Sequence, residues 1–389
     1  MTGSSLKTTL NQSQHISVDS NNPPILGYNM HQIPIVFDNI VFSLQRAGGI
    51  SVVWQELLSR FIKSGCNNLS FIEHPSDNGN VFRQKLDLSQ GKILTPSLRW
   101  FTLERYCNPK IKSQEPFIFH SSYFRTCPNM NGINVTTVHD FTYDYFYKGK
   151  RRGAFLHLWQ RNRAIRIADA VVCISENTKR DLLKFLPDVD SKKVHVIYNG
   201  VSEDYHVIDN KDASLKDYLL FVGERVAYKN GRWFAEAIKG TGYKVLFCGK
   251  PMTDEEKLFY DSTLGVERYK VMSGLSNEEL NKVYNSVKCL VYPSSYEGFG
   301  IPVLEAQRAG CPVIALNASS IPEVIGVTPL LMQELTKEEL LGKLALLEDL
   351  EVRQHLVDAG LANAEKFSWD AAYEQYRALY EQLFNEYGQ

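Results

Sequence analysis

Two glutamates, Glu297 and Glu305, lie eight positions apart in the stretch SSYEGFGIPVLEAQRAGCPVIA, residues 294–315. The run CLVYPS before Glu297 is typical of a buried strand, and Ile301 followed by Pro302 is typical of a helix start. Glu297 is therefore expected just beyond the carboxyl end of a strand, and Glu305 about one turn into a helix. At this spacing they are too far apart to share a proton and are suited to bind the hydroxyls of two separate sugar-like groups. The alternative is an ordinary turn residue and an exposed helix residue.

Two cations are predicted at the end of another strand. In LLFVGERVAYKNG, Arg225 and Lys229 follow an apolar run and precede a helix. Two positive charges at such a place could hold a diphosphate. The alternative is a solvated loop in which neither charge has a ligand.

Two weaker signals lie in the first half of the chain. Gly48 and Gly49 precede a helix, so backbone N–H groups there could receive an anion, although such a pair is more often a simple turn. His139 follows the apolar run NVTTV and would project from a strand end. A histidine in that position is structural about as often as it is functional.

Short apolar runs alternate with helical segments along most of the chain and would position these residues. The runs include IPIVF, FIFH, NVTTV, AVVCI, VHVIY, YLLFVG, KVLFCG, CLVYP and CPVIAL. Such runs between helices are typical of parallel sheets with helices on both faces. The clearest helix runs from Ile50 to Ile62, and capping boxes at Ser276 and Thr336 predict two further helix starts.

The alternation divides into two parts near VHVIYNGVSEDYHVIDN, after which a new strand begins at Tyr218. We therefore predict an α/β fold of two doubly wound, Rossmann-like domains, with ligands bound in a cleft between the carboxyl ends of their strands. The expected parts are a disordered polar extension (1–30), an N-terminal domain (31–205), a C-terminal domain (206–370) and a C-terminal helix (371–389) that could return to the first domain.

Composition excludes several classes of protein. The seven cysteines are scattered without a CxxC pair, which argues against a disulfide framework and a zinc site. The chain has no apolar run of membrane-spanning length and no signal peptide at its start, so we expect a cytoplasmic protein. Charge is uneven: residues 1–200 hold 24 Lys and Arg against 15 Asp and Glu, and residues 201–389 hold 19 against 29. The basic half could face an anionic partner, or the surplus could lie on a solvated surface.

Residues 148–166 concentrate this positive charge. The segment has seven basic residues and no acidic one, interleaved with Phe155, Leu158, Trp159 and Ile165. A surface helix of this composition could rest on anionic lipid at the inner face of a membrane. The alternative is a core-packing helix whose polar face is merely basic. Nucleic-acid binding is not indicated, because repeated aromatic interleaving and known modules are missing from the sequence.

The motifs together carry a family resemblance. EGFGIPVLE resembles the E-x7-E signature of retaining GT-B-type glycosyltransferases, in particular family four, and the Gly-Gly turn, the HD turn and VGERVAYKN match in the same order. The resemblance runs from about Ile33 to the final helix and is nearest to bacterial mannosyltransferase-like enzymes of surface polysaccharide and lipopolysaccharide synthesis. Glu224 departs from the pattern, where relatives often have a small residue, and this puts fine donor selectivity in question.

The resemblance implies a role for each motif. Glu305 would bind the ribose of a nucleotide, and Glu297 the hydroxyls of the transferred sugar. Arg225 and Lys229 would neutralise the leaving diphosphate, and His139 would help place the sugar ring. Further substrate contacts are implied for residues of the glycine-rich turns: Gly48, Gly49, Gly223, Gly298, Phe299, Gly300 and Ile301.

The implied reaction is transfer of a hexose with retained anomeric configuration, without a metal ion or another cofactor. The preferred donor is a GDP-sugar, with GDP-mannose as the first choice, and the second choice of donor is a UDP-hexose. The acceptor would be a glycan or lipid-linked glycan. Two alternatives remain open. A single-Rossmann transferase would use a cation bound by Asp188 and Asp190, and a GT-B-shaped epimerase or nucleotide-sugar-binding protein would share the cleft.

Overall fold

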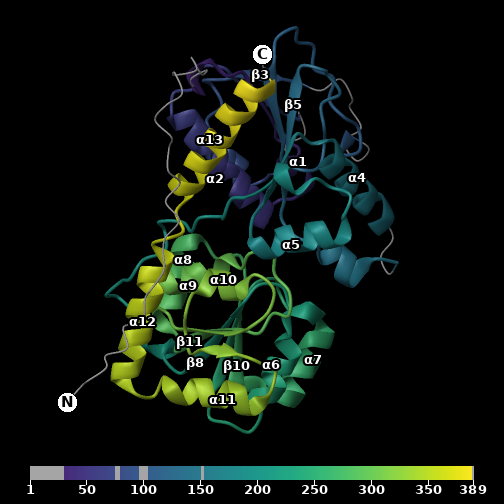
Figure 1. Cartoon of the computed structure of the whole chain (residues 1–389). Helices are drawn as coiled ribbons and strands as arrows, with labels where there is room; N and C mark the ends of the chain where they lie inside the picture. Colours follow the sequence, from purple (N-terminus) through teal and green to yellow (C-terminus); the bar gives the residue numbers. More distant parts are fainter. Residues whose placement is uncertain (1–29, 75–78, 96–103, 150–152, 388–389) are drawn as a thin grey trace, which may run out of the picture.

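The structure of the chain is a computed structural model that describes residues 30–74, 79–95, 104–149 and 153–387. It consists of two α/β domains, one above the other in Figure 1, each built on one parallel sheet. The prediction of two doubly wound α/β domains is therefore confirmed. The predicted extension over residues 1–30 lies outside the described residues, apart from Met30.

The sheet of the N-terminal domain has the strand order β3-β2-β1-β4-β5-β6-β7, with every pair parallel. Most of its residues are buried on both faces, as is usual for a parallel sheet covered by helices. Its strands are β1 (Ile35–Asp38), β2 (Leu69–Ile72), β3 (Lys92–Leu94), β4 (Phe117–Ser121), β5 (Gly132–Val138), β6 (Ala170–Cys173) and β7 (Val194–Val196).

The sheet of the C-terminal domain has the order β10-β9-β8-β11-β12-β13 and is also parallel throughout. In both sheets the strand order reverses next to the first strand of the domain, which is where ligands bind in such folds. Its strands are β8 (Tyr218–Val222), β9 (Lys244–Cys248), β10 (Tyr269–Met272), β11 (Cys289–Tyr292), β12 (Val313–Leu316) and β13 (Leu331–Met332).

The helices cover both faces of each sheet. They are α1 (Val41–Leu44), α2 (Gly49–Lys63), α4 (Ala154–Ile167), α5 (Glu176–Phe185), α6 (Gly231–Ile238), α7 (Asp254–Thr263), α8 (Asn277–Ser286), α9 (Ile301–Arg308), α10 (Ile321–Ile325), α11 (Lys337–Leu346), α12 (Leu350–Ala364) and α13 (Trp369–Tyr387). The capping box predicted at Ser276 is present with both of its hydrogen bonds. Thr336 caps α11 through its side chain, which accepts a hydrogen bond from the backbone N–H of Glu339.

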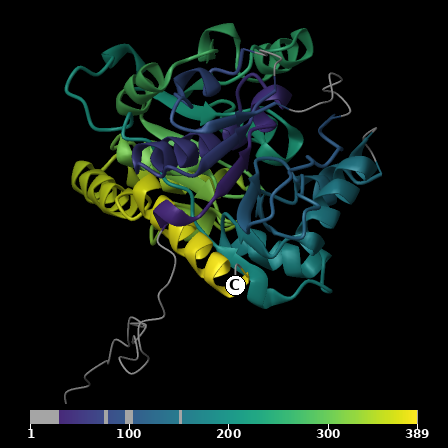
Figure 2. The same ribbon diagram turned by 90° about the horizontal axis from the view of Figure 1, so that it is seen from above.

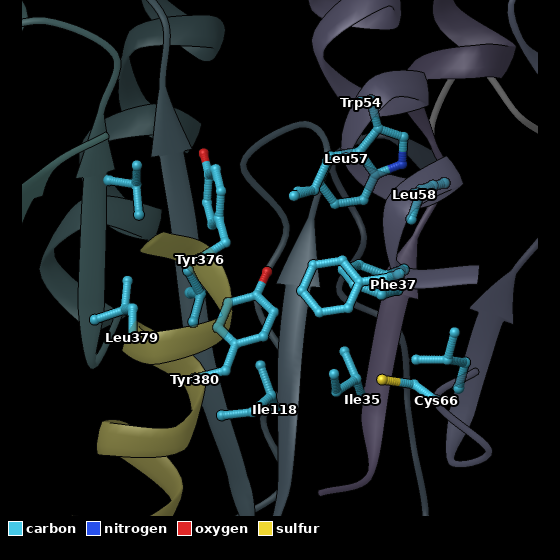
Figure 3. Close-up of a cluster of buried hydrophobic side chains, with 14 of the residues drawn as sticks. Ile35, Phe37, Trp54, Leu57, Leu58, Cys66, Ile118, Tyr376, Leu379 and Tyr380 are labelled. Carbon is cyan, nitrogen blue, oxygen red and sulfur yellow. The ribbon is translucent and has the colours of Figure 1, made fainter. Parts of the chain in front are cut away.

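The last helix joins the two domains. Figures 1 and 2 show α13 leaving the C-terminal domain and ending beside the N-terminal one. Its residues Tyr376 and Tyr380 lie in the same apolar core as Phe37 of β1 and Trp54 of α2 (Figure 3). Because these side chains are almost completely buried, the position of α13 ties the end of the chain to the first domain. None of the helices within the described ranges is both long and apolar enough to cross a membrane.

Candidate active site

Lys229 and Glu297 meet between the carboxyl ends of β8 and β11. Lys229 ends a short 3-10 helix, Ala227–Lys229, that follows β8, and Glu297 follows β11. Lys229 Nζ lies 3.0 Å from Glu297 Oε1, and both side chains are largely buried. Lys229 Nζ also lies 5.6 Å from the ring centroid of Tyr292, a buried side chain beside Glu297. A fixed cation and a fixed carboxylate are thus adjacent at the switch point of the sheet.

The backbone around Glu297 is held by two serines at the end of β12. The N–H of Glu297 donates to Ser319 Oγ at 2.9 Å. Ser320 Oγ donates to the carbonyls of Glu297 and Phe299 at 2.9 and 3.0 Å. Ser319 has a φ of 51°, which residues other than glycine rarely adopt and which is often retained at functional sites.

Three of the predicted glycines have positions that exclude a side chain. Gly223 has a φ of 116° and lies against Lys229, and Gly300, which precedes α9, has a φ of 98°. A Cβ on Gly298 would lie 1.9 Å from the carbonyl oxygen of His139. The glycine turn of the C-terminal domain therefore touches the end of β5 in the N-terminal domain.

Glu305 lies one turn into α9, on the wall of a cavity of about 60 Å³ that α2 lines from the other domain with Val52 and Gln55. The Tyr284 hydroxyl donates to Glu305 Oε2 at 2.9 Å, and the buried Tyr205 lies beside the same carboxyl group. Burial raises the pKa of Glu305 to about 7, against the opposing effect of the two tyrosines. Near neutral pH, both its protonated and its ionised forms are therefore populated.

Arg225 is held by helix α7 and not by Glu297. Its Nε donates to Glu256 Oε1 at 2.9 Å, and its Nη2 donates to Glu256 Oε2 at 3.1 Å and to the carbonyls of Lys250 and Pro251. Its Nη1 is buried without a hydrogen-bond partner. One nitrogen therefore remains for an anion, and the rest of the group ties the loop after β8 to α7.

His139, at the end of β5, has a neutral side chain at pH 7. Burial lowers its pKa to about 4. A neutral imidazole has one donor and one acceptor nitrogen, so it can pair with sugar hydroxyls without bringing a charge to the site.

Acidification is expected to destabilise the folded chain through His120, which lies in the core and hydrogen-bonds to Tyr380 and Thr137. Burial, followed by the proximity of His139, lowers the pKa of His120 from 6.5 to about 3. The unfolded chain therefore binds a proton that the folded chain excludes, and stability falls as pH drops below 6.5. Between pH 7 and 5.5 this group alone should lower the free energy of unfolding by about 1 kcal/mol, measured in urea.

The variant His120→Asn tests this assignment, because asparagine does not titrate. The difference in unfolding free energy between pH 7 and 5.5 should shrink by about 1 kcal/mol in this variant. His355→Asn, at an exposed position of α12, is the matched control and should leave the difference unchanged. An unaltered pH difference in His120→Asn would assign the acid sensitivity to other groups.

The remaining predicted residues are the glycine pair before α2, Phe299 and Ile301. Gly48 and Gly49 form the start of α2, and a Cβ on Gly49 would meet no atom within 4 Å. Phe299 is buried among Tyr198 and Phe367, so its side chain is not available to a ligand. Ile301 packs against the cores of both domains.

The aspartates of the metal-dependent alternative have other partners. Asp188 pairs with Arg166 at 2.7 Å, and Asp190 accepts a hydrogen bond from the N–H of Lys192. Both precede β7, so they lie toward the amino end of the sheet, opposite the edge that meets the C-terminal domain.

Several residues of the site are missing from the sequence prediction. They are Tyr284 and Tyr205 beside Glu305, Tyr292, Ser319 and Ser320 beside Glu297, and Glu256 beside Arg225. Only the capping pattern of Thr253 and Glu256 is visible in the sequence, and it indicates a helix start without indicating a contact with Arg225.

Two family models match consecutive parts of the chain. The model described as Glycosyltransferase Family 4 matches residues 47–205, and Glycosyl transferases group 1 matches residues 207–361. The O-antigen chain mannosyltransferase B of Escherichia coli is 24% identical over 310 residues, which are 74% of this chain and 78% of that protein. The serotype-specific mannosyltransferase WbdA of Escherichia coli is 29% identical over 224 residues, 52% of this chain but only 27% of that protein.

Solved structures share the fold. Sucrose-phosphate synthase from Thermosynechococcus elongatus superposes with a TM-score of 0.71 at 18% identity, covering 90% of this chain and 99% of that one. Anabaena Alr3699/HepE, solved in complex with UDP-glucose, superposes with a TM-score of 0.66 at 14% identity, covering 89% and 99%. With the two family models matching both domains in order, the chain belongs to the GT-B glycosyltransferases of the family 4 kind.

Proposed function

We propose that this glycosyltransferase moves a hexose from a nucleoside-diphosphate sugar to a glycan or lipid-linked glycan, with retention of the anomeric configuration and without a metal ion. Mannose is the first choice of hexose. The observation that carries the proposal is the Lys229–Glu297 pair at the carboxyl end of the sheet, next to the first turn of α9. A cation beside a carboxylate matches a ligand with a diphosphate at one end and sugar hydroxyls at the other.

Each side chain has a defined task in this proposal. Lys229, assisted by Arg225, stabilises the charge that develops on the leaving diphosphate, and backbone N–H groups near Gly300 and Gly49 add donors. Glu297 accepts hydrogen bonds from the sugar, and Glu305 from the ribose. His139 contacts the sugar ring in its neutral form. The leaving phosphate takes the proton of the acceptor, so no further base is needed.

The choice of donor draws on the relatives. Mannosyltransferase B and WbdA are named for mannosyl transfer, which supports mannose as the sugar, and GDP is proposed as the first nucleotide. The HepE complex contains UDP-glucose and supports a nucleotide sugar as the class of donor, with a UDP-hexose as the second choice.

Thermal unfolding with GDP, UDP, ADP and CMP tests the nucleotide. GDP at 100 times its Kd should stabilise the folded chain by about 2.7 kcal/mol, and the other three should stabilise it less. Transfer is then measured with GDP-mannose, UDP-glucose and a glycan acceptor, and the anomeric configuration of the product by NMR. Stabilisation by UDP alone would replace the GDP proposal, and an inverted product would contradict retention.

The proposal places the acceptor near an anionic membrane surface through helix α4. Phe155 and Trp159 are 82% and 48% exposed, and Arg163 lies next to Trp159 on the exposed side of the helix. A helix face with exposed aromatic and basic side chains suits the lipid headgroup region. One predicted cation is corrected: Arg161 is buried and pairs with Asp144, because α4 packs this side of the helix on the core.

Replacing Arg151, Arg152 and Arg163 by glutamine should weaken binding to anionic liposomes by about 100-fold, since each cation near such a surface contributes about 1 kcal/mol. Of these three arginines, only Arg163 lies within the described residues. Transfer to a water-soluble acceptor analogue should remain unchanged. The matched control replaces three exposed lysines of the C-terminal domain, Lys211, Lys216 and Lys239, by glutamine. Equal liposome binding by both triple variants would favour the reading of α4 as a core helix with a basic outer face.

A further inference from the structure

Helix α5 of the N-terminal domain is hydrogen-bonded directly to the loop of the C-terminal domain that contains Glu297, residues 294–300. Figure 1 shows α5 at the boundary between the domains. Ser175 Oγ, which caps α5, and Thr178 Oγ1 donate to the carbonyl of Gly298 at 2.7 and 3.2 Å. Gly298 is the residue directly after Glu297, so this contact fixes the loop on one side of the carboxylate.

Asp181, one turn further along α5, fixes the other side. The hydroxyl of Tyr296, the residue directly before Glu297, donates to Asp181 Oδ2 at 2.8 Å. Tyr145 of the N-terminal domain donates to Asp181 Oδ1 at 2.6 Å. The Tyr296 oxygen also accepts from the backbone N–H of Phe141 at 2.9 Å. All of these groups except Tyr145 are buried, and a buried polar contact of this kind holds its partners in one arrangement.

A second contact holds α5 against the C-terminal domain. The carboxylate of Glu323, in α10, accepts from the backbone N–H groups of Glu176 and Asn177, both at 2.9 Å. These are the first residues of α5, where the helix dipole favours a negative charge. The helix is therefore bonded to two separate elements of the other domain, α10 and the loop around Glu297.

Different residues of the loop around Glu297 are bonded to different domains. Among the described residues, the partners of Glu297 all lie within the C-terminal domain: Lys229, Ser319 and Ser320. Its neighbours Tyr296 and Gly298 are bonded to the N-terminal domain. If the domains separated, the glutamate would keep its own partners, but its neighbours on both sides would lose theirs.

We propose that Asp181 is a positioning residue for glycosyl transfer: through Tyr296 it fixes Glu297 in its working geometry only when the two domains are closed. The inference rests on the proposed role of Glu297 in binding the transferred sugar. In the proposed site the side chains that hold the nucleotide, Lys229, Arg225 and Glu305, all belong to the C-terminal domain, so binding of the nucleotide does not need the contact between Asp181 and Tyr296. Closure of the domains is thereby coupled to the chemical step and not to the first binding of the nucleotide.

Tyr296→Phe and Asp181→Asn test the proposal. Each should lower kcat by about 10- to 100-fold, the loss expected when a group that contacts the reacting sugar is slightly misplaced. The Kd for free nucleotide should change less than twofold. The double variant should be about as impaired as Tyr296→Phe alone, because both changes remove one interaction. Tyr145→Phe is the matched control, since it removes a donor from the same carboxylate without crossing the domain boundary, and its loss of kcat should be much smaller.

Hydrogen exchange gives a readout that does not depend on the donor. Backbone amides in residues 294–300 should exchange at least about tenfold faster in Tyr296→Phe, because one lost hydrogen bond can produce a change of this size. Backbone amides of β8 should exchange at an unchanged rate. Normal exchange and normal kcat in folded Tyr296→Phe would overturn the inference, as would a nucleotide Kd weakened as much as kcat. Glu297→Gln separates the two hypotheses: if it is inactive while Tyr296→Phe is normal, the inference fails and the proposed function stands. If Glu297→Gln is fully active, the proposed function itself fails.

Discussion

Lys229→Ala is expected to lower kcat by about 10²- to 10³-fold, the usual effect of removing a preorganised group that stabilises developing charge. A nucleoside diphosphate gains negative charge as its bond to the sugar breaks, and a cation fixed in a largely buried site acts most strongly at that moment. Lys229 meets this requirement because Glu297 and Tyr292 hold its Nζ in place. The measurement is kcat with saturating donor and acceptor, together with the Kd for the free nucleotide.

Two further substitutions of Lys229 distinguish the effect of its positive charge on activity from the effect of its packing. Lys229→Met keeps the apolar stem of the side chain and should lose as much activity as Lys229→Ala. Lys229→Arg keeps the charge in another shape and should lose less. Arg225→Ala should also lower kcat, but it breaks the pair with Glu256 as well, so its effect on the melting temperature must be measured alongside. Near-normal kcat in Lys229→Met would show that the charge is not used in the reaction.

The same assays test the metal-dependent alternative. Asp188→Asn combined with Asp190→Asn should keep near-wild-type activity, because these side chains pair with Arg166 and cap a turn at the amino end of β7. Transfer should also survive excess EDTA. If EDTA abolished transfer and Mn²⁺ or Mg²⁺ restored it, with the aspartates essential and Lys229 dispensable, the proposed mechanism would be wrong.

The sequence was sufficient to predict the architecture, because its signal is local. Buried strands such as β8 and β11 have continuous apolar runs, and the apolar face of α2 has helical spacing. Three of the strands that the pattern missed, β3, β10 and β13, are short or exposed, and the buried strand β2 was missed because Ser70 interrupts its apolar run. In β10, for example, Lys270 and Val271 are exposed, so the segment lacks the apolar run of a buried strand. Edge strands and short strands therefore escape a prediction that depends on burial.

The partners of the site residues could not be predicted, because they come from distant segments. Tyr284 precedes Glu305 by 21 residues, and Asp181 precedes Tyr296 by 115. Arg225 and Lys229 are equivalent in the sequence pattern, yet Lys229 contacts Glu297 and Arg225 contacts Glu256. Which way a side chain turns depends on packing in the folded chain, and no local spacing encodes it.

Glu297→Gln is expected to lower kcat by about 10²-fold or more with little change in the affinity for free nucleotide, since the sugar is the part of the donor that Glu297 is proposed to contact. Glu305→Ala should instead weaken both free nucleotide and donor by about 10- to 100-fold, because a hydrogen bond to a charged group contributes about 1.5 to 3 kcal/mol. Isothermal titration with nucleotide and donor, beside kcat, separates the two effects. Equal losses of free-nucleotide affinity in both variants would contradict this division of tasks.

The pKa of Glu305 adds a test that depends on its ionisation alone. Ribose hydroxyls donate to a carboxylate, so bound donor favours the ionised form, and donor affinity should rise with pH through about 7. If only the ionised form binds, the gain between pH 6 and 8 is about tenfold. The sugar-linked diphosphate does not titrate in this range, so the dependence belongs to the protein. Glu305→Gln should abolish it and Glu297→Gln should retain it. A pH dependence that survives in Glu305→Gln would assign the ribose contact to another group.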